Sequence, residues 1–281
     1  MSAPRWLFAS ILAASAASPV LLSTGEARAE QDPIMHRSDA GVDLYLWSTR
    51  SFGTTITAVP FVQWDPTHNL FIGLRFPTVI GFDPTRAGLG NPTFSIWYSD
   101  ISGDLTWYAG GRASLPMGLV EDRDWRGVVG NGAYSMGFWD VYLWALDSLP
   151  IGGFGGIEYQ FTHWFVLRAG GDLGLYPSLR RSRDFGAVRS GDVDVVLQLK
   201  AEPEFQSRSG AGGGISLMTW VIPTASGDIA QTLVSPYFVY DPRRTFFMRA
   251  GALLALDRPL GDAFRTGGVF SGYLQFGGHL D

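Results

Sequence analysis

The sequence predicts an all-β fold, an antiparallel transmembrane β-barrel of about twelve strands that follows a cleaved signal peptide. Three features of the 281 residues indicate this fold: an export-type N-terminus, long strands with charges opposite an apolar face, and connections that alternate between short and long. Aromatic residues make up 14% of the chain, and the mean hydropathy is +0.09. No second apolar run is long enough for a helical span, which argues against a helical inner-membrane protein.

The N-terminus has the pattern of a secretory signal peptide. Arg5 precedes an apolar run over residues 6–17, and the small residues of Ala27-Arg28-Ala29 suit the cleavage position. The run is shorter than the ~20 residues that a spanning helix needs, and Ser18 and Pro19 interrupt it. We therefore expect residues 1–29 to be removed and residues 30–281 to form a single outer-membrane barrel domain. An uncleaved anchor is the alternative.

Composition excludes several classes of function. The chain has no cysteine, which rules out a lipoprotein, disulfides, cysteine-zinc sites and thiol catalysis. Removing residues 1–29 moves the formal net charge from −5 to about −6. A negative chain of this kind gives no indication of a nucleic-acid partner.

The clearest strand covers residues 191–205 and alternates between apolar and polar side chains. Such a run suits a tilted membrane strand, which needs ~9 to 11 residues to cross, better than an average soluble strand. One face carries Val193, Val195, Leu197, Leu199, Ala201 and Phe205, and the other carries Asp192, Asp194, Gln198, Lys200, Glu202 and Glu204. In a membrane barrel the apolar face meets lipid and the charged face lines a wet lumen.

Other strands repeat this pattern, with charges midway along the polar face. The predicted lumen-lining residues are Arg75, Arg112, Glu158, Arg168, Asp172, Asp194, Gln198, Lys200, Glu202, Arg249 and Asp257. Unlike charges on neighbouring strands can form ladders that brace a narrow barrel, which is the favoured interpretation. The alternative is a transverse field that orients a passing solute.

Connection lengths predict the topology. Short connections lie at residues 65–69, 100–104, 162–163, 206–209 and 241–244, and longer ones at 78–90, from 118 onward, 177–190, 224–229 and 258–266. Outer-membrane barrels combine short periplasmic turns with longer external loops. Aromatic side chains gather beside the short connections, as expected of a girdle at the membrane boundary. The predicted strands are 40–49, 54–64, 69–78, 91–100, 104–117, 148–161, 163–176, 191–205, 210–223, 230–240, 244–257 and 266–280, with both termini periplasmic.

The aromatic segment at residues 132–147 does not fit an even strand count. We assign it to the external loop that begins at Gly118, and a further strand is the alternative. Phe138, Trp139, Tyr142 and Trp144 are its candidate functional residues. They are expected to pack on the barrel mouth or to fold inward as a constriction or plug.

Two short motifs resemble a known family. Gly88-Leu89-Gly90-Asn91-Pro92 is followed, after a strand, a turn and another strand, by Leu115-Pro116-Met117-Gly118. This pair resembles motifs of the outer-membrane barrel family named for the meta-pathway of phenol degradation, over about thirty residues. Asn91 stands where Asp is usual in that family, and Met117 where Thr is usual. The resemblance implies a barrel that passes small organic molecules, and it brings no catalytic residue.

The sequence does not predict an enzyme. Outer-membrane hydrolases need a serine and a histidine near the outer leaflet, yet His36, His68, His163 and His279 are all expected at the periplasmic end. No serine lies in a Gly-x-Ser-x-Gly context. The acidic residues of the strand at 191–205 would spread along ~40 Å, so no metal site is expected, and no cofactor is implied.

These observations favour a passive pore or channel for small solutes, organic ones included, in a Gram-negative outer membrane. A closed structural or ligand-binding barrel with a plugged lumen is the alternative, and a lipid hydrolase ranks third. The expected partners are outer-membrane lipid, the outer-membrane assembly machinery and a small-molecule solute, and no nucleic acid. Oligomeric state and the identity of the solute stay open at this point.

Overall fold

The computed structural model describes residues 36–49, 53–82, 85–117, 123–179, 193–224, 230–242, 245–257 and 270–280. The chain divides into two units, Met1–Glu30 and Gln31–Asp281, and the second holds every element described below. The expected signal peptide at residues 1–29 lies outside the described residues.

Among the described residues, fourteen strand segments form the sheet, and the connection between β7 and β8 contains helix. The strands are β1 (Asp39–Thr49), β2 (Gly53–Trp64), β3 (Leu70–Arg75), β4 (Thr78–Phe82), β5 (Thr85–Leu89), β6 (Thr93–Ser102), β7 (Leu105–Ser114), β8 (Ile151–Thr162), β9 (Phe165–Pro177), β10 (Val193–Gln206), β11 (Ala211–Val221), β12 (Ala230–Tyr240), β13 (Phe246–Ala255) and β14 (Phe270–His279). Between β7 and β8 lie α2 (Arg123–Ser135) and the 3-10 helix η3 (Val141–Leu143).

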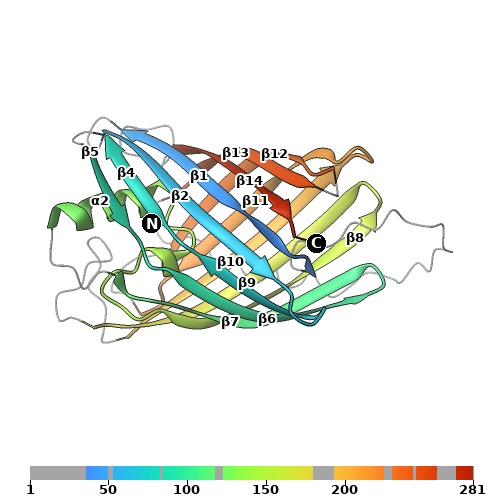
Figure 1. The fold of residues 1–281 in the computed structure, drawn as a ribbon, viewed down its shortest axis with the longest axis horizontal. Coiled ribbons are helices and arrows are strands. Elements are labelled where there is room, and N and C mark those ends of the chain that lie inside the picture. The colour runs from blue at the N-terminus through green and yellow to red at the C-terminus, as the bar shows by residue number, and fades with distance from the viewer. Residues whose placement is uncertain are drawn as a thin grey trace, which may run out of the picture. The chain divides into compact units, whose positions relative to one another are not determined.

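The sheet closes on itself as a twelve-strand barrel. β3 and β4 both pair with β2, so together they make one strand of the wall. β6 pairs with β3 and β5 pairs with β4, so β5 and β6 together make the next wall strand. β1 pairs with β14 in antiparallel register, Asp39 opposite His279, which joins the two edges. The predicted antiparallel barrel and its strand count are confirmed. Figure 1 shows the tilted strands, with α2 at the left-hand end of the barrel.

The predicted long external loop over residues 78–90 is wrong, because this stretch is the hairpin β4–β5. The alternation continues through it: Val79 is buried while Ile80 and Phe82 are exposed. Proline has no N–H to give to a ladder, so Pro77 interrupts the strand without ending it. Pro77 therefore separates β3 from β4, and the same wall strand resumes beyond it.

The alternative of a further strand at residues 132–147 is also excluded, since the segment holds the end of α2, turns and η3.

The two ends of the barrel differ in the length of their connections. We call "turn end" the end with the short connections at residues 65–69, 103–104, 163–164, 207–210 and 241–245, where β1 begins and β14 ends. We call "loop end" the opposite end, where residues 115–150 join β7 to β8.

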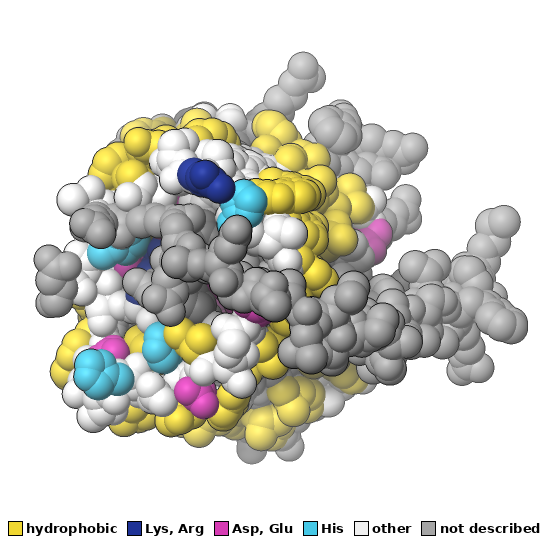
Figure 2. Space-filling view, turned by 90° about the vertical axis from the view of Figure 1, so that its right-hand side faces the viewer, with side chains coloured by type: hydrophobic (Ala, Val, Ile, Leu, Met, Phe, Trp, Pro, Cys, Tyr) yellow, Lys and Arg dark blue, Asp and Glu magenta, His cyan; other side chains and the backbone are white. Residues whose placement is uncertain are grey.

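Side chains along each strand divide between an apolar outer face and an inner face that carries the charges. On β10, Leu199 is 45% exposed whereas Glu202 is 1% exposed. A water-soluble protein has the opposite preference, because charged residues are rarely fully buried unless paired. Figure 2 shows the turn end, with hydrophobic side chains around its outer edge and histidine and charged side chains among polar atoms on the end face.

Within the described part of the chain, no helix combines the length and apolar character needed to cross a bilayer.

Besides its charged side chains, the barrel interior has apolar regions, which lie toward the loop end. They join α2 and η3 to inward side chains such as Val79, Trp220 and Leu233. The loop-end half of the interior is therefore packed, and the packing element is the connection between β7 and β8.

Candidate functional site

The described residues of the connection between β7 and β8, 115–117 and 123–150, are here called the inserted loop, and they fold into the barrel. The two ends of the loop lie side by side, since Ser114 N donates to Pro150 O at 3.0 Å. Tyr134 stacks on Trp47 of β1 with ring centres 5.6 Å apart. Trp220 of β11 donates its indole N–H to Gly137 O at 3.2 Å. The loop thus contacts strands that are not neighbours in the barrel, since β14, β13 and β12 lie between β1 and β11.

Hydroxyl groups add further attachments near the end of α2. Ser135 Oγ donates to Thr57 Oγ1 of β2 at 2.7 Å, and Ser271 Oγ of β14 donates to Ser135 O at 2.6 Å. Gly137 has a positive φ of 61°, and a side chain there would press on Leu233 and Leu253. Only glycine suits this close approach to the wall without strain.

The predicted loop residues lie inside the barrel in different degrees of burial. Tyr142 and Trp144 are buried, and Phe138 and Trp139 are partly buried. Phe138 meets Tyr134 edge-on at 4.9 Å between ring centres. The hydroxyl of Tyr142 lies against Gly152 and Gly174 of the wall, where glycine leaves room for it.

Asn91 clamps the inserted loop to the wall. Its N–H donates to Leu143 O at 2.7 Å, and its side-chain amide donates to Ala145 O at 2.8 Å and to Tyr142 O at 3.3 Å. Its side-chain oxygen accepts from Met117 N at 3.0 Å. Asn91 is fully buried. The two motifs of the family resemblance, residues 88–92 and 115–118, therefore meet at the base of the loop, through the hydrogen bond between Met117 and Asn91.

A chain of alternating charges crosses the lumen at the level of the loop. It consists of Asp43, Arg75, Asp140, Arg112 and Asp172, and we call it the transverse chain. Arg75 binds Asp43 at 2.6 Å and also Asp140, while Arg112 binds Asp140 at 2.9 Å and Asp172 at 2.8 Å. Its ends are on β1 and β9, and its middle member, Asp140, belongs to the inserted loop.

Arg112 has two further partners. Its guanidinium carbon lies 3.8 Å from the centre of the Tyr142 ring, and one N–H reaches Gln198 Oε1 at 3.3 Å. A guanidinium over an aromatic face is attracted by the ring electrons. The inserted loop therefore contacts Arg112 twice, through a carboxylate and through an aromatic ring.

A second group of charges, the central cluster, lies nearer the turn end. Its members are Glu158, Arg168, Lys200, Glu202, Glu204 and Arg249. Arg168 binds Glu158 at 2.7 Å and Glu204 at 2.8 Å. Glu202 binds Lys200 and Arg249 and accepts from Ser216 Oγ at 2.6 Å. Buried charges are tolerated when they are paired and hydrogen-bonded in this way.

A terminal ring of charges lies at the turn end of the interior. Arg37 binds Asp39 and Asp241, each at 2.7 Å. His279 contacts the same two carboxylates, Asp39 at 2.7 Å and Asp241 at 3.2 Å. The ring joins the start of β1, the β12–β13 turn and the end of β14.

Most of the predicted lumen residues lie in these groups. The structure places Arg75, Arg112 and Asp172 in the transverse chain, Gln198 beside it, and Glu158, Arg168, Lys200, Glu202 and Arg249 in the central cluster. Asp194 and Asp257 lie apart from both, at the loop end. Asp194 contacts Thr224 at 3.4 Å, and Asp257, exposed beyond β13, accepts from the Gln231 side chain and from Thr232 N at 2.6 Å each.

Several members of these groups are not among the predicted lumen-lining residues. Glu204 is predicted on the polar face of residues 191–205 but not among the lumen-lining residues, and Asp43 follows the inward period of β1, so alternation could have placed it. Asp140 and Asn91 lie outside the strands, where no period indicates a partner. The histidines, in contrast, are at the turn end as expected, with His68 and His163 in short connections and His279 at the end of β14.

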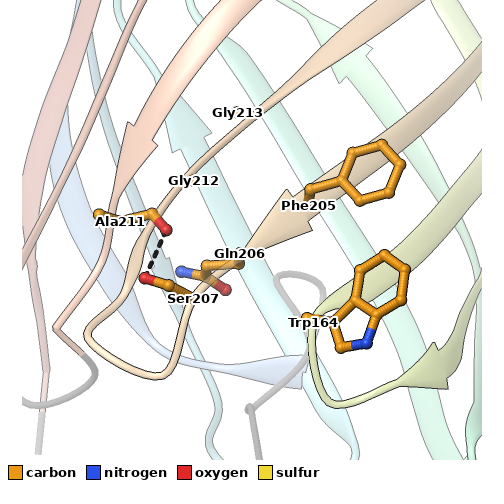
Figure 3. A pocket seen from close by; sticks show the side chains of 7 residues that line it. All are labelled: Trp164, Phe205, Gln206, Ser207, Ala211, Gly212 and Gly213. Atoms are coloured by element: carbon orange, nitrogen blue, oxygen red, sulfur yellow. Dashed lines mark hydrogen bonds between the residues drawn. The ribbon is translucent and has the colours of Figure 1, made fainter.

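A shallow groove on the turn end is a different kind of feature. Trp164 stacks on Phe205 with ring centres 5.6 Å apart, and Gly212 and Gly213 leave space beside them, as Figure 3 shows. Its lining has no charged side chain, and it fits an aromatic girdle rather than a ligand site. Among the described residues, no group of three or more histidine or acidic side chains is placed to hold a metal ion.

Solved structures share this architecture. The NanC porin matches with a TM-score of 0.56 and 8% identity, over 87% of this chain and 100% of that chain. An outer membrane channel from Pseudomonas putida F1 matches with a TM-score of 0.56 and 13% identity, over 92% of this chain and 100% of that chain. No protein-family model and no curated protein matches the sequence. At such identities the likeness shows the fold, a closed antiparallel twelve-strand barrel.

Proposed function

We propose that this protein is a channel for small solutes in a Gram-negative outer membrane, with the barrel lumen as the path. The observation that carries the proposal is the distribution of side chains in a closed barrel: apolar groups such as Leu199 and Leu217 face outward, and paired charges such as Glu202 face inward. Lipid stabilises the first arrangement, and a polar conduit needs the second.

Localisation and partners follow from the same surface. The outward apolar band would contact outer-membrane lipid, the N-terminal pattern would direct export, and insertion would use the outer-membrane assembly machinery. The structural neighbours support this assignment, since their names describe a porin and an outer membrane channel. Nothing in the arrangement of the described histidines favours a hydrolase, because they lie at the turn end, away from the loop end where an outer leaflet would be.

The inserted loop would set the width of the path. Phe138, Trp139, Tyr142 and Trp144 lie in the interior and would narrow the lumen at the loop end. Small organic solutes are the finer proposal, supported by the resemblance to the phenol meta-pathway family. Its two motifs meet through the hydrogen bond from Met117 N to Asn91 Oδ1, at the base of this constriction.

Purified protein in planar bilayers tests the proposal directly. We expect discrete conductance steps from the full chain. A variant with residues 118–147 replaced by a short Gly-Ser linker should give larger steps, and the neighbouring ends of the loop allow that replacement. Liposome swelling with neutral and charged solutes measures the same path independently.

The second candidate is a closed structural or ligand-binding barrel. The packing of the inserted loop against several strands of the wall, among them β1 and β11, favours it. It predicts no conductance and no swelling with the full chain. If the folded linker variant also fails to conduct, the lumen is not a path and the channel proposal is wrong.

A further inference from the structure

The attachment of the inserted loop to the wall is electrostatic at its centre. Asp140 is 4% exposed, and its two carboxylate oxygens are divided between Arg75 of β3 and Arg112 of β7. Loops that serve only to fill a barrel can be held by apolar contacts alone. Here the ion pairs across the middle of the lumen depend on one carboxylate, that of Asp140, which the loop supplies.

The wall can remain neutral when this carboxylate leaves. Arg75 also binds Asp43, and Arg112 also binds Asp172, so each arginine keeps one acidic partner on the wall. With the loop in place the transverse chain has three acids and two bases, and without it two of each. Withdrawal therefore leaves no unpaired buried cation, which is the usual penalty for breaking a buried ion pair.

The loop backbone is strained beside this contact. Phe138 has a φ of 55° and Asp140 a φ of 58°, in the left-handed region that residues other than glycine rarely adopt. Strain of this kind persists only where surrounding contacts impose it, and it gathers at switch regions. Release of the loop would relax both residues.

The attachment of the loop at Asn91, close to β8, suits a hinge. Asn91 holds the carbonyl groups of Tyr142, Leu143 and Ala145, next to the point where the chain returns to β8. Leu149 N donates to Pro177 O at 3.0 Å, which fixes that return to β9. The α2 side is held by Asp140, Ser135, stacked rings and the apolar cluster that α2 shares with Val59 and Val79.

From these observations we propose that the inserted loop is a releasable gate, hinged at Asn91 and latched by Asp140 between Arg75 and Arg112. The proposal rests on the proposed channel function. Opening moves the α2 side away from β1 and β2 and leaves each arginine paired with the acidic partner that it already has on the wall. Loss of the negative charge at position 140 should favour the open state, because two neighbouring guanidinium groups then lose the carboxylate between them.

A disulfide lock tests the movement. The chain has no cysteine, and the side-chain oxygens of Thr57 and Ser135 are 2.7 Å apart, within reach of a disulfide in the variant T57C/S135C. Oxidation should reduce single-channel openings at least about tenfold, and a reductant should restore them; a tenfold change corresponds to about 1.4 kcal/mol. The single variants T57C and S135C, treated identically, should not respond.

Charge removal tests the latch. Asp140→Asn should raise open probability at least about tenfold, whereas Asp100→Asn, which removes a carboxylate beside the β6–β7 turn away from the loop, should not. Folding of each variant is checked by heat-modifiable mobility in detergent. If the linker variant conducts while the oxidised lock and Asp140→Asn behave like their controls, the loop is static and the gate is wrong. If the folded linker variant does not conduct, the channel function itself fails.

Discussion

Arg249 lies over the ring of Tyr237, its guanidinium carbon 3.5 Å from the ring centre, and both side chains reach the carboxylate of Glu202. Tyr237 OH donates to Glu202 at 3.1 Å and to Glu204 at 2.9 Å. This stack gives a buried carboxylate both a counter-charge and a hydrogen bond from neighbouring strands. Removing different parts of it should therefore have different consequences.

Replacing Arg249 by Met keeps most of the aliphatic part of the side chain and removes the charged guanidinium group. Glu202 then loses a direct partner while staying buried, and we expect a loss of about 3 to 5 kcal/mol in the free energy of unfolding. Tyr237→Phe removes only hydrogen bonds and should cost about 1 to 3 kcal/mol. Urea unfolding in detergent micelles measures both. Equal costs would show that the charge of Arg249 adds nothing to the cluster.

Asn91→Asp should weaken the hinge more than Asn91→Ala. A carboxylate cannot donate to Tyr142 O and Ala145 O, and it would face both carbonyl groups at hydrogen-bond distance. We expect about 1 to 3 kcal/mol for the lost hydrogen bonds, with repulsion added in the Asp variant. Faster protease cleavage within residues 118–147 reports the loosened loop. Protection equal to that of the wild type would contradict the clamp.

Substitution by alanine should lower stability at one of two adjacent glycines of β8 and leave it unchanged at the other. A methyl group at Gly152 would collide with the Tyr142 hydroxyl and with Leu173 O, whereas at Gly153, on the outer face, the nearest atom is Gly110 O at 3.4 Å. Gly152→Ala should cost about 1 to 3 kcal/mol through overpacking, and Gly153→Ala should be close to neutral. Thermal unfolding measured by heat-modifiable mobility distinguishes them. A neutral Gly152→Ala would mean that Tyr142 does not rest on this wall.

The outer face of β10 offers a test of membrane depth. Leu199 lies midway along the strand and Val193 at its loop end, and both are exposed on the outer face. Leu199→Arg should cost about 2 to 4 kcal/mol at the bilayer midplane, and Val193→Arg about 0 to 1 kcal/mol near the boundary. Folding into liposomes across a urea series gives both values. Equal costs for the two variants would place the band outside the hydrocarbon layer.

Alternation predicted the wall because the chemistry changes at every residue of a barrel strand. Asp194 and Glu202 point inward for the same reason that Val193 and Leu199 point outward, so a period of two survives in the sequence. β4 and β5 were missed because proline and glycine at residues 77 and 90–92 resemble a loop, although the strands resume beyond them.

The loop contacts could not be predicted in the same way. Asp140 finds Arg75 and Arg112 through a fold of the inserted loop that no local period encodes. Asn91 belonged to a recognised motif, yet its role depends on carbonyl groups more than fifty positions away. Sequence pattern therefore predicted which faces line the lumen, and tertiary placement decided what fills it.

The terminal ring joins residues from the two ends of the barrel strand order. Asp39 and His279 are 240 positions apart and meet because β1 pairs with β14. Arg37 reaches Asp241 over 204 positions for the same reason. A chain that has formed most of its wall but not joined its edges lacks these contacts altogether. The ring therefore stabilises only the completed cylinder, and truncation at the C-terminal strand would deprive the first strand of its histidine partner.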